Sequence, residues 1–163
     1  VMAIGGVMAA YSAQNSGNLN PKRARESFFK GLWLSIGIMT VLSLLLLPLR
    51  DNIATIFYQR GSEVFDLTVR YMFYLIIGLP LMAIFQAFIG AYNGNAKTNY
   101  TFIVSITRLW GTRIPLILIL VYHFTMGPSG VWTGMLISNF IIAFVAYFFY
   151  KDLDFKPNVQ LDI

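Results

Sequence analysis

Three long stretches of this 163-residue chain contain no aspartate, glutamate, lysine or arginine, and they limit the possible fold more than any other feature. They cover residues 31–49, 71–96 and 114–150. A helix needs roughly 20 predominantly apolar residues to cross a bilayer, so each of the first two stretches predicts one transmembrane helix. The third is too long for one helix, and the turn-forming sequence at 126–130 divides it. We therefore expect an all-α integral membrane protein.

The composition agrees with a membrane location. Hydrophobic residues make up 57% of the chain and charged residues only 12%, whereas about a quarter of an ordinary soluble domain is charged. A soluble fold of this composition would expose large apolar patches to water, which soluble monomers rarely tolerate. The chain also has no cysteine, which excludes a disulfide-stapled module and thiol chemistry.

The apolar stretches and their flanks predict about four and a half transmembrane helices. The four whole helices are expected at about residues 28–49, 69–93, 101–123 and 131–150. Residues 1–14 are apolar but shorter than a bilayer crossing, so we interpret them as half a helix whose beginning lies outside the chain. Residues 152–163 are expected to form a charged tail.

Lysine and arginine indicate the orientation in the membrane. Counting lysine and arginine alone, the connection after the half helix, the connection near Lys97 and the tail after residue 150 together hold more of them than residues 50–70, where arginine is mixed with acidic residues. By the positive-inside rule, the first set of connections and the C-terminus are cytoplasmic. We therefore expect an integral protein of the cell inner (plasma) membrane with lipid around it. The net charge of +5 reports this topology, and no nucleic-acid partner is expected.

Two arginines, Arg108 and Arg113, fall inside an expected span. Burying a charge at the bilayer centre costs about 2.5 to 3.5 kcal/mol even on the lenient insertion scale. The two side chains either pair within the helix bundle and hold it together, or they contribute to a substrate pathway. No acidic residue lies in the four expected helices, so this part of the sequence contains no carboxylate that could couple transport to an ion.

The second whole helix contains the sequence Gly78-Leu79-Pro80. A proline in the middle of a span removes a backbone hydrogen bond and kinks the helix, so Pro80 is a candidate hinge. Uncharged polar residues in the spans either line a substrate pathway or join helices through hydrogen bonds. The pathway candidates are Gln86, Tyr92, Asn93 and Asn139.

The chain offers little for catalysis. We find no Ser/His/Asp set, no pair of carboxylates and no metal-ligand cluster in the sequence, so neither an enzyme nor a metal site is expected, and no cofactor. Trp33, Trp110 and Trp132 fall towards the ends of spans, which is typical of an interfacial aromatic belt.

Read in order, several short motifs resemble the C-terminal half of the multidrug and toxic compound extrusion (MATE) transporters. Gln14, Asn15 and Gly17 belong to the first of these motifs. The others are residues 23–26 (RARE), 31–35 (GLWLS), 78–80 (GLP), 90–98 (GAYNGNAKT), 113–116 (RIPL) and 130–132 (GVW), with Ser138.

The resemblance implies a parent with twelve transmembrane helices in two six-helix lobes, of which residues 1–151 would form most of the C-terminal lobe. The half helix would be the eighth helix, and the four whole helices would be the ninth to twelfth. An N-terminal lobe is the competing register. Such a parent would exchange organic cations or amphipathic drug-like compounds for sodium ions or protons by alternating access, together with the missing N-terminal lobe.

One branch of the family has an acidic residue just before the glycine that matches Gly94, and here that position is Asn93, which cannot titrate. Ion coupling would then depend on residues outside this chain. Two other hypotheses remain: a flippase for lipids or lipid-linked oligosaccharides of the same superfamily, and a truncated fragment that does not transport.

Overall fold

The computed structural model describes residues 2–17, 21–151 and 153, and within these ranges it is all-helical. The expected fold class is confirmed. The elements are α1 (Met2–Gly17), α2 (Pro21–Phe57), α3 (Glu63–Gly94), α4 (Thr98–Ile106), the π-helix η1 (Thr107–Arg113), α5 (Ile114–Leu118), the π-helix η2 (Ile119–His123) and α6 (Pro128–Lys151). The segments from α4 to η2 follow one another without a break and form one long helix. Four helices in the described part are long and apolar enough to cross a membrane.

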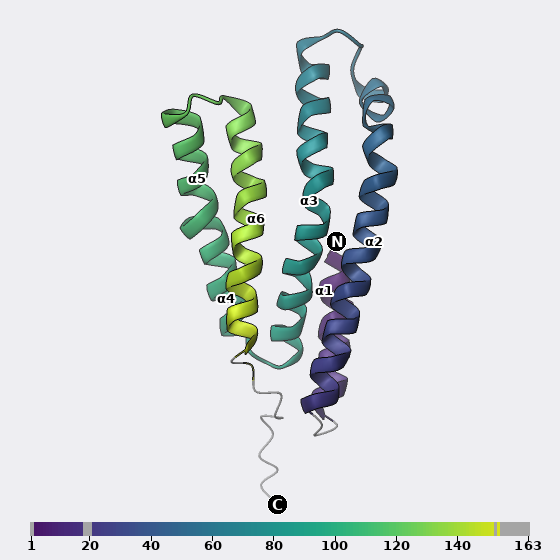
Figure 1. Ribbon diagram of the computed structural model, residues 1–163, viewed down its shortest axis with the longest axis vertical. Coiled ribbons are helices and arrows are strands. Elements are labelled where there is room, and N and C mark those ends of the chain that lie inside the picture. Colours follow the sequence, from purple (N-terminus) through teal and green to yellow (C-terminus); the bar gives the residue numbers. More distant parts are fainter. Residues whose placement is uncertain (1, 18–20, 152, 154–163) are drawn as a thin grey trace, which may run out of the picture.

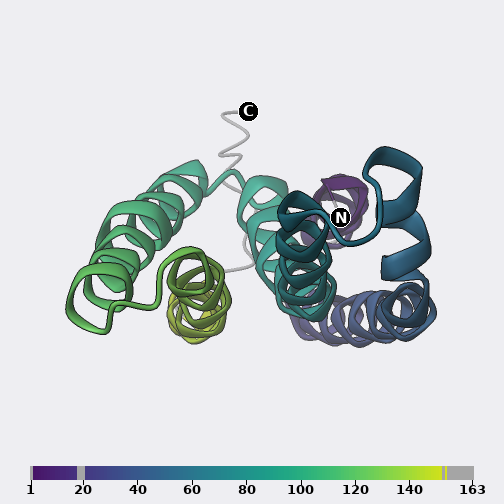
Figure 2. The same ribbon diagram turned by 90° about the horizontal axis from the view of Figure 1, so that it is seen from above.

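Successive long helices run in opposite directions (Figure 1). The end of α1, the start of α2, the α3–α4 connection and the end of α6 lie at one end of the molecule, whereas the α2–α3 connection and the turn before α6 lie at the other (Figure 1). Viewed from above, α1, α2 and α3 form one group, and α6 packs with the helix from α4 to η2 on the other side of α3 (Figure 2). The basic connections therefore share one end, which we call the basic end.

The helices are longer than the sequence analysis expected. The expected helix 28–49 is part of α2, which runs from Pro21 to Phe57, and the expected helix 69–93 is part of α3, which runs from Glu63 to Gly94. Charge-free stretches mark only what can lie in the hydrocarbon core, and a helix can continue beyond it with charged side chains in water. The expected tail at 152–163 lies outside the described residues, except for Leu153.

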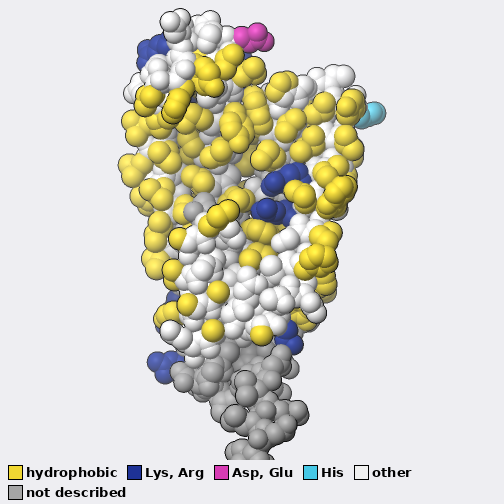
Figure 3. All heavy atoms as spheres, turned by 180° about the vertical axis from the view of Figure 1, so that it is seen from behind, with side chains coloured by type: hydrophobic (Ala, Val, Ile, Leu, Met, Phe, Trp, Pro, Cys, Tyr) yellow, Lys and Arg dark blue, Asp and Glu magenta, His cyan; other side chains and the backbone are white. Residues whose placement is uncertain are grey.

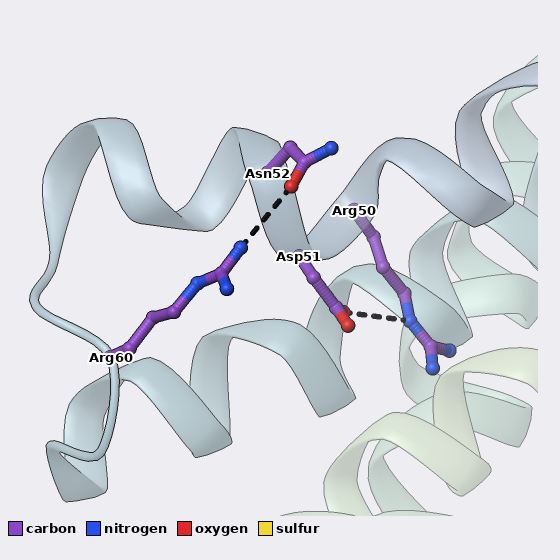
Figure 4. Close-up of polar contacts among 4 residues, drawn as sticks. All are labelled: Arg50, Asp51, Asn52 and Arg60. Atoms are coloured by element: carbon purple, nitrogen blue, oxygen red, sulfur yellow. Dashed lines mark hydrogen bonds and ion pairs between the residues drawn. The ribbon is translucent and has the colours of Figure 1, made fainter.

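The last turns of α2 turn aside after Pro48, which stands inside the helix (Figure 1). Polar side chains contact one another beside this bend (Figure 4). The Nε atom of Arg50 lies 3.2 Å from a carboxylate oxygen of Asp51, and a terminal nitrogen of Arg60 donates to the side-chain oxygen of Asn52 at 3.3 Å. Ser62 then caps α3 by accepting a hydrogen bond from the Phe65 N–H at 3.2 Å.

An aromatic core joins α2, α3 and α6 at the basic end. The rings of Phe28 and Tyr150 stack with their centroids 4.4 Å apart, and Phe88 packs against both rings at 5.3 and 5.5 Å. All three side chains are buried. Aromatic pairs at these separations add about 0.5 to 1.5 kcal/mol beyond the burial of their surface, so this end of the bundle is firmly packed.

Small residues bring α1 against α3. A Cβ atom added at Gly90 would lie 2.5 Å from the carbonyl oxygen of Gly5 and 2.7 Å from Cβ of Met8. One added at Gly94 would collide with the carbonyl oxygen of Ala9. Gly90 and Gly94 therefore form a small-xxx-small contact that lets two backbones approach closely, the usual way in which membrane helices associate.

Gly90→Ala is expected to lower the melting temperature of the full-length protein in detergent. The added methyl group meets backbone atoms of α1 that cannot turn away, and overpacking of this kind costs about 1 to 3 kcal/mol. Gly37→Ala is the matched control, because a Cβ at Gly37 has no neighbour within 4 Å. Equal melting temperatures for the two variants would contradict this account of the α1–α3 contact.

Candidate functional site

An apolar pocket with a cavity volume of about 270 Å³ lies between α3 and α6, away from the basic end. Aromatic rings form part of its wall: the Trp132 ring lies 5.7 Å from that of Tyr74 and 5.9 Å from that of Tyr71, measured between centroids. The remaining lining residues are Leu75, Gly78, Leu79, Met82, Met135, Leu136 and Asn139. The pocket can therefore receive a flat apolar group.

A second cavity of about 350 Å³ adjoins this pocket and shares Tyr74 with it. It lies at the end of the molecule opposite the basic end, and its wall includes Arg50 and Arg70. The guanidinium group of Arg50 lies over the ring of Phe73, 5.3 Å from the centroid. The outer cavity is thus more polar than the pocket beside it and carries positive charge.

Arg113 is bound to α6 by two hydrogen bonds. Its Nε donates to the hydroxyl oxygen of Ser138 at 3.2 Å, and a terminal nitrogen donates to the side-chain oxygen of Asn139 at 2.9 Å. Both acceptors are neutral. Arg113 therefore ties η1 to α6, but these contacts leave its positive charge uncompensated.

Arg108 points to α3 instead. Its guanidinium carbon lies 4.0 Å from the centroid of the Phe85 ring, and a terminal nitrogen lies 3.7 Å from the sulfur of Met82. The Nε atom is buried and has no hydrogen-bond partner among the described residues. Figure 3 shows basic side chains at mid-height in an otherwise largely apolar face. Arg108 and Arg113 lie on either side of the midpoint of the span Thr98–His123, which agrees with this height.

The π-helix η1 brings two arginines five residues apart towards the same side of the helix. In an α-helix of 3.6 residues per turn, residues i and i+5 point about 140° apart. A π-helix bonds i to i+5 and has a wider turn, which reduces this angle. Pro115, two residues after the end of this segment, cannot donate a backbone bond, an interruption that commonly accompanies helix distortion.

The structure separates the four predicted pathway residues. Asn139 lines the pocket. Tyr92 is fully buried, and its hydroxyl donates to the carbonyl oxygen of Ala146, so it joins α3 to α6 and does not line the pocket. Asn93 is exposed and accepts a hydrogen bond from the Thr101 hydroxyl at 2.7 Å, beside the α3–α4 connection.

Gln86 and the family-motif residues lie away from the pocket as well. The side-chain oxygen of Gln86 would be 3.5 Å from a Cβ on Gly5, so this side chain lies against α1. Gln14 is exposed near the end of α1, where Asn15 donates to the carbonyl oxygen of Tyr11 at 2.8 Å, and α1 ends at Gly17.

Helix α3 is not broken at Pro80, because another helix replaces the missing hydrogen bond. Pro80 has no N–H to donate to the carbonyl of Ile76, four residues before it. The Ser43 hydroxyl of α2 lies 2.8 Å from this carbonyl oxygen and also 2.8 Å from that of Met39. Since the hydroxyl has one proton, it can serve either carbonyl. Pro80 remains a candidate hinge, and the Ser43 hydroxyl can donate to the carbonyl that Pro80 leaves free.

An all-helical bundle with membrane-spanning helices, charges inside the spans and an internal pocket defines a polytopic integral membrane protein. The MatE family model matches residues 1–119 of the chain. Because this match covers most of the sequence, the chain belongs to the MatE family, as the motifs predicted.

Named relatives agree with this assignment. Protein DETOXIFICATION 32 of Arabidopsis thaliana is 27% identical over 164 residues, which cover 99% of this chain and 32% of the relative. A protein named probable multidrug resistance protein NorM in Listeria innocua is 24% identical over 144 residues, which cover 88% of this chain and 31% of the relative. The chain thus spans about a third of the length of these relatives.

Two solved structures share the fold. The inward-facing conformation of a multidrug resistance MATE family transporter matches with a TM-score of 0.82 and 17% identity, covering 91% of this chain and 34% of the other. The eukaryotic MATE transporter AtDTX14 matches with a TM-score of 0.83 and 19% identity, covering 95% and 34%. The described helices therefore have the arrangement of part of a MATE transporter.

Ser43→Ala is expected to destabilise the full-length protein by about 1 kcal/mol, because it leaves the Ile76 carbonyl without a donor. The loss should largely disappear in a Pro80→Ala background, where residue 80 regains an N–H for that carbonyl. Melting temperatures of the two single variants and the double variant in detergent measure this coupling.

Thr40→Ala is the control, because the Thr40 hydroxyl bonds only within its own helix, to Ile36 at 2.8 Å. If Ser43→Ala had the same effect with and without Pro80, the bond between α2 and α3 would not be what compensates for the proline.

Proposed function

We propose that this chain forms most of the C-terminal lobe of a secondary active exporter that moves organic, drug-like compounds out of the cell in exchange for sodium ions or protons. The observation that carries the proposal is the pocket between α3 and α6 within a lobe of MATE architecture. A largely apolar pocket with a few polar groups is the usual form of a small-molecule site. The names of the relatives, which include multidrug resistance, support export as the direction of transport.

Transport in this proposal is a conformational cycle and requires no enzymatic step. Asn139, at the pocket wall, is the part of the predicted pathway that this geometry supports best. The second lobe of the exporter would close the cavity from the other side. Lipid surrounds the helices, the exporter lies in the plasma membrane, and its C-terminus is cytoplasmic, in keeping with the basic connections at one end.

The coupling ion acts outside this chain. The described acidic residues are Glu26, Asp51, Glu63 and Asp66, and all of them lie near helix ends or connections. The position before Gly94 is occupied by Asn93, which cannot release a proton. The carboxylate that binds sodium or a proton is therefore proposed to belong to the other lobe or to a helix that precedes α1.

Expression of the full-length transporter in bacterial cells that lack their own drug exporters is expected to lower the accumulation of ethidium several-fold. Collapse of either the proton gradient or the sodium gradient should restore accumulation and identify the coupling ion. The proposal is wrong if the protein reaches the membrane and ethidium accumulates as in cells with an empty vector.

Pro80→Ala is expected to reduce ethidium export several-fold at an unchanged level of protein in the membrane. The substitution restores the backbone bond to Ile76 and stiffens α3. Gly37→Ala, on the exposed face of α2, is the control for a neutral change in a span. If the Pro80→Ala variant exports ethidium at the normal rate, Pro80 is not a hinge of the transport cycle.

A further inference from the structure

We propose that Arg108 and Arg113 form the anion-binding end of the pocket between α3 and α6, and that this lobe binds amphipathic organic anions. The apolar body of such a compound would occupy the pocket, and its carboxylate or sulfonate would meet the guanidinium groups. The inference rests on the transport function proposed above and names the substrate class for this lobe.

The first argument is the charge balance at the centre of the span. Each arginine contacts neutral groups: an aromatic ring and a thioether sulfur for Arg108, a hydroxyl and an amide oxygen for Arg113. In the described part of the chain neither forms an ion pair, and the ion pair that is present joins Arg50 and Asp51. Two like charges in an apolar surrounding attract an anion strongly, because little water screens them.

The second argument is that both arginines meet the pocket wall. Met82 lines the pocket and contacts Arg108, whereas Asn139 lines the pocket and accepts a hydrogen bond from Arg113. The Nε donor of Arg108 has no partner within the described residues. A small movement of either wall residue would bring a guanidinium edge to an anion in the pocket, and charge-assisted bonds of this kind are the strong ones.

The third argument is the charge beside the pocket. The outer cavity, which shares Tyr74 with the pocket, carries Arg50 and Arg70. Arg50 forms an ion pair with Asp51, but Arg70 has no ion-pair partner in the described part of the chain. Positive charge beside an apolar wall raises the local concentration of anions.

The test uses the purified full-length transporter and three probes with one naphthalene ring system: 2-naphthalenesulfonate, the neutral 2-naphthalenesulfonamide and the cationic 2-naphthylmethylammonium. Titration calorimetry should show that the sulfonate binds about tenfold more tightly than the sulfonamide, since a charge-assisted bond is roughly twice as strong as a neutral one. The cation should bind this pocket most weakly, so a cationic compound such as ethidium would be carried at a part of the full-length transporter outside this pocket. Equal binding of all three probes, or a preference for the cation, would overturn the inference.

Arg113→Gln and Arg108→Gln should each remove most of the preference for the sulfonate, and Arg113→Lys should keep part of it. Arg60→Gln is the matched control, because it removes the same charge at an exposed residue that bonds only Asn52. If a glutamine variant does not fold, the relative affinities of the wild-type protein for the sulfonate, the sulfonamide and the cation still test the inference. A carboxylate from elsewhere in the transporter that neutralises both arginines would abolish this preference, and that result also overturns the inference.

Ethidium export separates this result from the proposed function. Export of ethidium without a preference for the sulfonate would leave the transport function standing and remove the anion site. A preference for the sulfonate without any export would leave the anion site standing and remove the transport function.

Discussion

The absence of water from the bilayer core is the constraint on which the rest of this structure depends. A backbone or side-chain polar group there must find its partner in the protein, because leaving it unpaired costs several kcal/mol. The requirement explains the continuous helices, and it also explains where the helices touch. Ser43 reaches the carbonyl that Pro80 frees, the Tyr92 hydroxyl reaches the backbone of α6, and Arg113 reaches Ser138.

The same requirement divides polar residues that look alike in the sequence. Tyr92 and Asn139 are both uncharged polar residues in apolar spans, and the pattern predicted a common role for them. Tyr92 is buried, and its hydroxyl donates a hydrogen bond to a backbone carbonyl. Asn139 accepts a hydrogen bond from Arg113 and still lines the pocket. A sequence shows that a polar group lies in a span, but the neighbouring helix decides whether any of it faces a cavity.

The spans could be predicted because charge is excluded from the hydrocarbon core, and this rule needs no knowledge of neighbouring helices. Helix ends could not be predicted from the same rule, since α2 and α3 continue beyond the apolar stretches. It was also missed that Arg108 and Arg113 both contact residues of the pocket wall, because an α-helical spacing sends them to different faces. Pro115 was the available signal that the helix departs from α geometry there. Trp132, which lies towards the end of its span as the sequence indicated, also lines the pocket.

Packing is uneven along α3, and this unevenness agrees with the hinge proposed at Pro80. At the basic end, Phe88 lies in the aromatic core, and Gly90 and Gly94 hold α1 in direct backbone contact. On the other side of Pro80, α3 faces the pocket, where its contact with α6 is incomplete. We propose that α3 bends at Pro80, where a side-chain hydrogen bond from Ser43 takes the place of a backbone one. The hydroxyl of Ser43 can turn from Ile76 to Met39, so bending at Pro80 would exchange one hydrogen bond for another and leave the hydroxyl satisfied.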